Sequence, residues 1–330
     1  MSWSTQIQQR LPQIWLSRGW IAWALRPVSW VYGALLALRR LAYATGLAQT
    51  HRLPACVIVV GNVVAGGAGK TPMTMALVKH LLAQGLRVGV VSRGHGRRTH
   101  DTRAVQANSA PQDVGDEPLL ICQSTGVPVW VGASRADAGR QLLQAHPDVQ
   151  VIVCDDGLQH LALARDIELC VMDERGVGNG WLLPAGPLRE AWPRPVDLWV
   201  HTGRPALPGG FQAPRQLADH ALRSNGQKVA LQDLKGLPIH AVAGLARPEA
   251  FFDMLRQKGL TLACTTALPD HHDYKDWHAS DAGTPLLCTE KDAAKLWAHD
   301  PQALAVPLQI MPEPAFWQAL DALMAPHLRA

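Results

Sequence analysis

One glycine-rich run constrains the fold of this chain more than any other part of its sequence. Between an apolar stretch and a stretch with helical character lie the letters GGAGKT, at residues 66–71. A turn of this kind lets backbone N–H groups converge on phosphate oxygens, and the start of the next helix adds partial positive charge. Lys70 adds a full charge, and Thr71 has the hydroxyl that such loops use to hold Mg²⁺. The run therefore predicts a nucleotide-binding loop.

This phosphate loop, residues 64–71, departs from the common consensus at its first position. The pattern G-x-x-x-x-G-K-[ST] has glycine where this chain has Val64, so the match is to the subtype Gly-Gly-x-Gly-Lys-Thr. The residues predicted to bind the nucleotide are Val64, Ala65, Gly66, Gly67, Ala68, Gly69, Lys70 and Thr71.

Apolar stretches alternate with helical stretches on both sides of the loop. This alternation is typical of an α/β fold with a parallel sheet flanked by helices, as in P-loop NTPases. Predicted strands cover residues 56–60, 87–91, 127–131, 150–154 and 168–172, and predicted helices cover 71–84, 117–124 and 135–146.

A proline-rich stretch at 184–214 separates this pattern from a second, shorter alternation between residues 240 and 298. The 330 residues are enough for two packed lobes, since domains usually run to about 100–200 residues. We therefore predict an N-terminal segment at 1–50, a nucleotide-binding domain at 51–224 and a smaller α/β lobe at 225–330.

The N-terminal segment is rich in tryptophan. Arg26-Pro27 divides its apolar residues into pieces too short to cross a membrane, which takes about 20 uninterrupted apolar residues. An amphipathic helix lying in the membrane interface is the favoured interpretation, with its arginines reaching anionic lipid. Docking on the protein's own core and a single membrane span are the alternatives. The residues concerned are Trp15, Arg18, Trp20, Trp23, Arg26, Trp30, Arg39 and Arg40.

An acidic pair, Asp155 and Asp156, follows the apolar letters VIVC. Ligands of open α/β sheets bind at the carboxyl ends of the strands, and a phosphate loop needs a second anchor for its metal. We therefore expect this pair to hold Mg²⁺ together with Thr71, and which of the two carboxylates contacts the metal directly stays open.

Composition narrows the class of partner. A net charge of +4 and a pI near 8.8 are too mild to predict nucleic-acid binding without a basic cluster. The cysteines lie mostly in apolar runs and have no paired spacing, so we expect reduced core residues. The first residues lack the pattern of a cleavable signal, so a cytoplasmic body is expected.

Four further motifs carry a resemblance to a known family. They are SRGHGR at 92–97, DDGLQH at 155–160, LPAGPLRE at 183–190 and TEKDA at 289–293. With the phosphate loop, and in this order, they resemble the tetraacyldisaccharide 4′-kinase family of lipid A biosynthesis, over most of the chain. The resemblance implies transfer of the γ-phosphate of ATP to the 4′-hydroxyl of an acylated glucosamine disaccharide 1-phosphate, giving lipid IVA. It also implies that this reaction takes place at the cytoplasmic face of a bacterial inner membrane.

The resemblance also assigns roles to residues. Asp116 matches the family's proposed general base, although an aspartate there also suits an ordinary helix cap. His271 is the expected partner of that base, with His272 as the alternative, and Glu190 resembles a carboxylate near the metal. Candidates for contacts to the substrate or to phosphate are Arg93, Arg97, Gln159, His160 and Arg189, the arginines because a planar guanidinium grips two phosphate oxygens.

Two other functions use similar loops. Membrane-associated ATPase or GTPase switches usually have a lysine before the paired glycines, where this chain has Ala65, and the guanine-reading pattern Asn-Lys-x-Asp is missing. A nucleotide-sensing module without turnover is the third alternative. ATP consumption that depends on added acylated disaccharide would separate it from a kinase.

Overall fold

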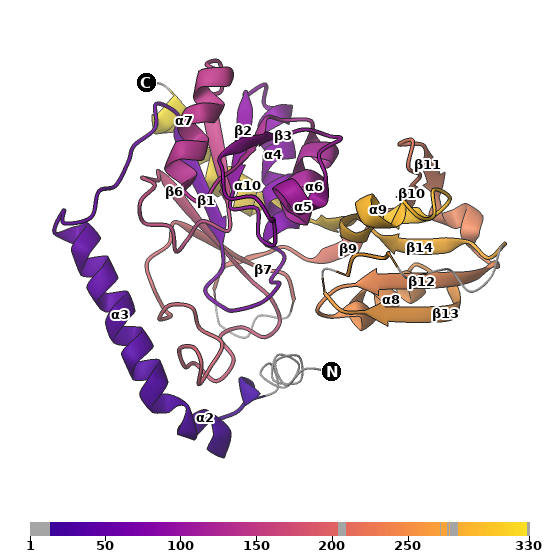
Figure 1. Cartoon of the computed structure of the whole chain (residues 1–330), viewed down its shortest axis with the longest axis horizontal. Coiled ribbons are helices and arrows are strands. Elements are labelled where there is room, and N and C mark those ends of the chain that lie inside the picture. The colour runs from indigo at the N-terminus through magenta and orange to yellow at the C-terminus, as the bar shows by residue number, and fades with distance from the viewer. Residues whose placement is uncertain (1–13, 204–208, 271, 276, 278–282, 329–330) are drawn as a thin grey trace.

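The computed structural model describes residues 14–203, 209–270, 272–275, 277 and 283–328. Two sheets organise these residues, and Figure 1 shows them side by side with the N-terminal helices at the edge of the larger body. The prediction of an α/β fold with a second, smaller lobe is confirmed.

The larger sheet has the strand order β3-β4-β2-β5-β1-β6-β7-β8. Its strands are parallel except β3, which runs antiparallel to β4. Their bounds are β1 Cys56–Gly61, β2 Val88–Ser92, β3 Arg103–Val105, β4 Val129–Val131, β5 Val151–Asp155, β6 Ile167–Met172, β7 Leu198–His201 and β8 Phe211–Gln212.

Helices cover both faces of this sheet. Along β1, Ile58 and Val60 belong to one buried cluster while Val57 and Val59 belong to another, because successive strand side chains point to opposite faces. A strand that is buried on both faces reads as an unbroken apolar run, as the letters CVIVV do. The helices of this body are α4 Lys70–Ala83, α5 Pro111–Val114, α6 Asp116–Thr125, α7 Arg135–Ala145 and α10 Pro314–Leu328.

The smaller sheet has the order β11-β10-β15-β14-β12-β13. The elements of this lobe are β10 His220–Leu222, β11 Lys228–Ala230, η1 Leu231–Leu234, β12 Pro238–Gly244, α8 Pro248–Gln257, β13 Thr261–Leu268, β14 Leu286–Thr289, α9 Glu290–Leu296 and β15 Leu304–Val306. Between the two lobes, β9 Arg215–Leu217 pairs antiparallel with β16 Leu308–Ile310.

Helix α10 lies within the residues assigned above to the smaller lobe, yet its buried side chains pack in the core of the larger sheet. Phe316, Leu320 and Met324 share a cluster with Ile58 of β1, and the ring of Phe316 meets that of Phe211 at a centroid distance of 5.7 Å. The chain therefore leaves the larger body through β9 and returns to it through β16.

The N-terminal segment forms two helices, α2 Trp20–Ala24 and α3 Arg26–Ala44. The break falls at Leu25, and Pro27 occupies the first turn of α3, where a missing N–H costs nothing. Within the described part of the chain, neither α3 nor any other helix is long and apolar enough to cross a bilayer.

One side of these helices docks on the loop at 179–190. Trp15 donates to the carbonyl of Pro184, Ser29 to that of Leu182 and Tyr32 to that of Arg189, at 2.8–2.9 Å. Ser29 is buried by this contact. The segment is thus fixed to the body by its inner face.

Three of the four arginines of the segment contact the body, while Arg39 is exposed. Arg18 and Arg26 lie over the ring of Trp181, with Cζ 5.2 and 4.1 Å from its centroid. Arg40 pairs with Glu190. The body offers these guanidinium groups an aromatic face and a buried carboxylate, and both kinds of group attract a guanidinium.

The six cysteines are unpaired. The expectation that they are core residues holds for those that are buried, but Cys264 on the edge strand β13 is exposed.

Candidate active site

The phosphate loop joins β1 to α4, as the sequence predicts. Gly66 and Gly69 have φ angles of +95° and +90°, a region that glycine enters without steric cost. A Cβ on Gly69 would also lie 3.2 Å from Cδ1 of Ile310, in the returning strand β16. The glycines are therefore required by the turn and by the close approach of the strand that links the lobes.

Neighbouring segments hold the loop in shape. The side-chain amide of Asn62 donates to the carbonyl of Gly66 at 3.2 Å, and the backbone N–H of Ala65 donates to the carbonyl of Pro187 at 2.8 Å. Arg175 donates to the carbonyls of Ala65 and Gly67, both at 3.3 Å. With its carbonyls engaged in this way, the loop is pre-organised on its protein side.

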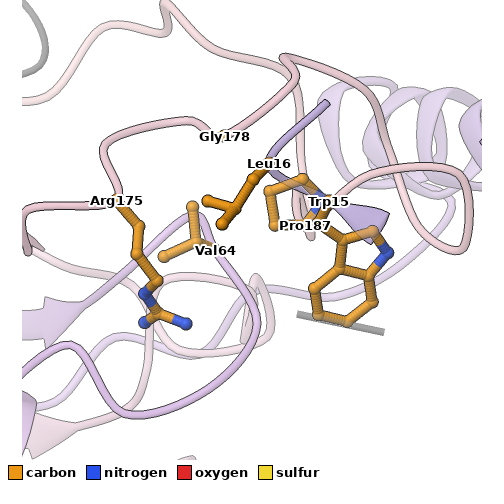
Figure 2. A pocket seen from close by; sticks show the side chains of 6 residues that line it. All are labelled: Trp15, Leu16, Val64, Arg175, Gly178 and Pro187. Atoms are coloured by element: carbon orange, nitrogen blue, oxygen red, sulfur yellow. The ribbon is translucent and has the colours of Figure 1, made fainter. Parts of the chain in front are cut away.

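Arg175 is a residue that the sequence interpretation missed. Figure 2 shows its guanidinium beside Val64, in a small pocket that Leu16 and Pro187 also line. The buried carboxylate of Asp173 anchors it at 2.8–3.0 Å. Its position in the sequence could have revealed it. The DER triplet at 173–175 directly follows β6, which pairs with β1, so it ends near the phosphate loop that follows β1.

A cluster of charged side chains lies at the start of α4. Nζ of Lys70 is 3.7 Å from Oδ2 of Asp156, and Nη1 of Arg189 is 3.0 and 3.2 Å from the two carboxylate oxygens. Burial works to raise the pKa of Asp156, but Lys70 and Arg189 outweigh it and hold the pKa below its usual value. The structure thus brings two of the predicted site residues, Lys70 and Arg189, to the ionised carboxylate of a third, Asp156.

Asp155 differs from its neighbour in its pKa and its contacts. Oδ1 accepts a 2.8 Å hydrogen bond from Thr74, whereas Oδ2 is buried with no hydrogen-bond partner among the described residues. Burial, followed by the charges of Glu117 and Asp156, raises the pKa of Asp155 to about 7. An orphaned carboxylate oxygen of this kind suits a hard cation, and Thr71 is buried one helical turn before Thr74.

The described residues contain no cluster of three or more His, Cys, Asp or Glu side chains able to hold a metal. A Mg²⁺ site needs few protein ligands, since Mg²⁺ keeps waters and takes substrate phosphates as ligands. The orphaned oxygen of Asp155 and the hydroxyl of Thr71 at the start of α4 fit such a site.

Glu190 has different neighbours from those expected of a metal ligand. Its carboxylate pairs with Arg40 and with Arg194, whose Nη1 lies 3.3 Å away, and it accepts a 2.7 Å bond from Gln159. Cations and an amide already occupy this buried carboxylate, so we leave Glu190 out of the metal site. It joins the N-terminal helix α3 to the DDGLQH loop, because Gln159 also donates to the carbonyl of Asn62 at 3.0 Å.

His160 lies behind the acidic pair. The backbone N–H of Arg135 donates a 3.3 Å hydrogen bond to Nε2 of His160, so this nitrogen acts as an acceptor and carries no proton. Burial and the nearby Arg135 and Arg165 lower the pKa of His160 to about 4. A neutral histidine in this place orders the start of α7 and supplies no charge to a phosphate.

Asp116 begins α6, directly after Gly115, whose φ is +93°. Its Oδ2 accepts a 2.6 Å hydrogen bond from Nζ of Lys295, in α9 of the smaller lobe. The expected partner His271 lies outside the described residues. The alternative, His272, accepts at Nδ1 from the backbone N–H of Tyr274 at 3.0 Å within its own loop.

The arginines of the SRGHGR motif follow β2. Arg93 is exposed. Arg97 is partly buried, and its Nη1 has no hydrogen-bond partner in the described part of the structure. Arg97 thus retains a donor for an anion, whereas Arg93 is an exposed cation at the same loop.

Comparisons with known proteins agree with this geometry. A family model described as tetraacyldisaccharide-1-P 4′-kinase (LpxK) matches residues 21–325. A tetraacyldisaccharide 4′-kinase of Acidovorax sp. strain JS42 is 56% identical over 324 residues, 97% of this chain and 95% of the relative. One from Polaromonas naphthalenivorans is 55% identical over 332 residues, with coverage of 98% and 96%.

A solved structure agrees as well. The crystal structure described as the "apo" form of LpxK from Aquifex aeolicus in complex with ATP superposes with a TM-score of 0.81 at 28% identity, covering 93% of this chain and 99% of that one. The similarity thus extends over both lobes in sequence and in structure. The chain belongs to the tetraacyldisaccharide 4′-kinase family of ATP-dependent kinases in lipid A biosynthesis.

Proposed function

We propose that this kinase transfers the γ-phosphate of ATP to the 4′-hydroxyl of tetraacyldisaccharide 1-phosphate, forming lipid IVA and ADP at the cytoplasmic face of the inner membrane. The new bond joins the 4′-oxygen to phosphorus, and the bond between phosphorus and the β–γ bridging oxygen breaks. The hydroxyl proton passes to a base. Membership of a kinase family leaves no support for the alternative of a switch ATPase or GTPase.

The single observation that carries the proposal is the meeting of Lys70, Asp155 and Asp156 at the carboxyl edge of β1 and β5. The phosphate loop binds the nucleotide phosphates through its backbone, and Lys70 adds a charge that opposes the one developing on the transferred group. Arg189 is the second cation of this cluster. Until phosphate arrives, Asp156 holds both cations in place.

Mg²⁺ would be held by Thr71 and by the free oxygen of Asp155, with Asp156 as the alternative carboxylate. When bound, the ion would supply positive charge to the phosphate oxygens. The near-neutral pKa of Asp155 means that this carboxyl can stay protonated in the empty site and ionise when a cation stabilises its charge.

Asp116 is the proposed general base for the 4′-hydroxyl. In phosphoryl transfer the base accepts a proton while positioning and charge neutralisation supply most of the rate, so orientation of the carboxylate matters more than strong basicity. Asp116 meets this need, because its carboxylate is buried and fixed by a contact from the other lobe.

The first test is substrate-dependent ATP consumption. With Mg²⁺ present, ADP should form only when tetraacyldisaccharide 1-phosphate is added, and mass spectrometry should show one new phosphate on the lipid. Fast ADP release without lipid would contradict the kinase assignment in favour of an ATPase switch. Nucleotide binding without either product would favour a sensing module.

Membrane association is supported by the outer face of the N-terminal helices. The inner face of α3 docks on the body, while apolar side chains on its other side are exposed at helical spacing. Trp20 is 80% exposed and Leu38 is 63% exposed. The exposed set comprises Trp20, Ile21, Trp23, Val28, Trp30, Val31, Leu35, Leu38 and Leu41. An apolar face of this extent is typical of a helix that lies in the lipid interface.

Replacing both Leu35 and Leu38 by serine is therefore expected to release the protein from vesicles while leaving activity on detergent-dispersed lipid within about twofold, since only vesicles require the enzyme to find a surface. Flotation with vesicles measures the binding. Leu237 of the smaller lobe, 43% exposed, gives the matched control Leu237→Ser. Equal activity losses in detergent and vesicles, with a lowered melting temperature, would mean that this face packs on protein instead.

A further inference from the structure

An ion pair between the two lobes lies at the proposed base. Asp116 is the first residue of α6 in the larger body, and Lys295 lies in the last turn of α9 in the smaller lobe. Their Oδ2 and Nζ atoms are 2.6 Å apart, and the two side chains are only 8% and 11% exposed. The pair is therefore shielded from water, which makes it stronger and more dependent on geometry than a surface pair.

Helix α9 is built to present Lys295 rigidly. Thr289 caps its start by accepting a hydrogen bond from the backbone N–H of Asp292 at 3.2 Å. The buried carboxylate of Asp292 accepts from Oγ1 of Thr289 at 2.7 Å and from the backbone N–H of Gly244 at 3.0 Å. These bonds join α9 to the end of β12, so the position of Lys295 follows that of the whole smaller lobe.

The helix also contacts the larger body beside the pair. Glu290, the first residue of α9, is partly buried and forms a hydrogen bond with Ser124 of α6, and the charge of Lys79 of α4 also acts on it. Burial raises the pKa of Glu290 to about 7. Because the start of α9 is fixed against α6, we expect Lys295 to reach Asp116 only when this interface is formed.

We propose that Lys295 is a positioning residue that keeps Asp116 ionised and aimed when the lobes are together. The inference rests on the proposed role of Asp116 as the base. Only an ionised carboxylate accepts a proton, and a buried carboxylate that loses its cation keeps its own proton more readily. Lys295 therefore couples the competence of the base to docking of the smaller lobe, without itself touching the reacting atoms.

Four variants test this: Lys295→Met, Lys295→Arg, Asp116→Asn and the double variant of Lys295→Met with Asp116→Asn. Arg247→Met is the matched control, because Arg247 forms another ion pair between the lobes, with Glu174 and not with Asp116. Steady-state kinetics give kcat and the KM for ATP, and thermal melting reports on folding. Lys295→Met alone leaves the buried Asp116 carboxylate without this ion pair, which can destabilise the fold. The double variant removes both charges, so it can still be measured if Lys295→Met is unstable.

We expect Lys295→Met to lower kcat at least about tenfold, part of the factor of about 10²–10⁴ that a general base supplies, with the KM for ATP within about twofold. Lys295→Arg should recover most of this loss, and the Met substitution should cost little more once Asp116 is asparagine. Arg247→Met should leave kcat near wild type.

Three results would overturn the inference. They are near-wild-type kcat in a folded Lys295→Met protein, additive losses in the double variant, and an equal fall of kcat in Arg247→Met. Near-wild-type turnover by Asp116→Asn would instead remove the proposed base. The failure of the inference is thereby distinguished from failure of the proposed function.

Discussion

Replacing Lys70 by alanine is expected to lower kcat on the order of a thousandfold or more, the scale on which a charge at the transferred phosphoryl group acts. Lys70 begins α4 and is held 3.7 Å from Asp156, so its ammonium lies at the site without prior rearrangement. Because its side chain is 10% exposed, water cannot replace the lost charge effectively. Phosphorylated lipid formed per unit time measures the effect.

Lys235→Ala is the matched control for this experiment. Lys235 is an exposed lysine that follows η1 in the smaller lobe, and it belongs neither to the phosphate loop nor to the contact between the lobes. The control should keep kcat within about twofold, as surface substitutions away from a site usually do. Near-wild-type turnover by folded Lys70→Ala protein would remove the phosphate loop from the mechanism.

Replacing Asp155 by asparagine is expected to reduce kcat about a hundredfold to a thousandfold and to abolish stabilisation by Mg²⁺ with ATP. The amide keeps the size of the side chain and a partner for Thr74 but removes the charge that the cation needs. Melting temperatures with and without Mg²⁺-ATP, alongside kcat, check both parts. Stabilisation equal to that of the wild type would assign the metal to Asp156 instead.

Without nucleotide and Mg²⁺, the same substitution is expected to make the melting temperature depend less on pH. The pKa of Asp155 in the folded state is about 7, above the ordinary value of 3.8. Its contribution to stability is therefore present below the unfolded pKa and is lost as pH rises through about 7. Without Mg²⁺, the wild type should lose more melting temperature between pH 5 and pH 8 than the Asn variant does. Parallel losses in the two proteins would contradict the raised pKa.

The features that could be predicted from the sequence are local or periodic. The GGAGKT run specifies its own turn and helix start, and the unbroken apolar letters of β1 and β5 reveal strands buried on both faces. Asp155 and Asp156 follow from this, because parallel strands end at one edge of a sheet. The break between α2 and α3 follows from Pro27.

The remaining parts depend on contacts between distant positions. Lys295 is 179 residues from Asp116, and no local pattern joins them. Likewise, the carboxylate of Glu190 was expected at a metal, but Arg40, 150 residues earlier, pairs with it. Helix α10 was placed with its sequence neighbours, while the apolar face carrying Phe316 found its complement in the larger sheet. An amphipathic pattern states that a face is buried and does not state against what.

The paired strands β9 and β16 make the link between the lobes a double connection. A single linker lets one domain swivel about many axes, whereas two hydrogen-bonded strands resist twisting and bend most easily in one direction. Leu217 lies opposite Leu308 in this ribbon, and Ile310 of the same strand approaches Gly69 of the phosphate loop. The connection between the lobes therefore lies against the phosphate loop, so a rotation of the smaller lobe that moved β16 would also displace the contact of Ile310 with Gly69.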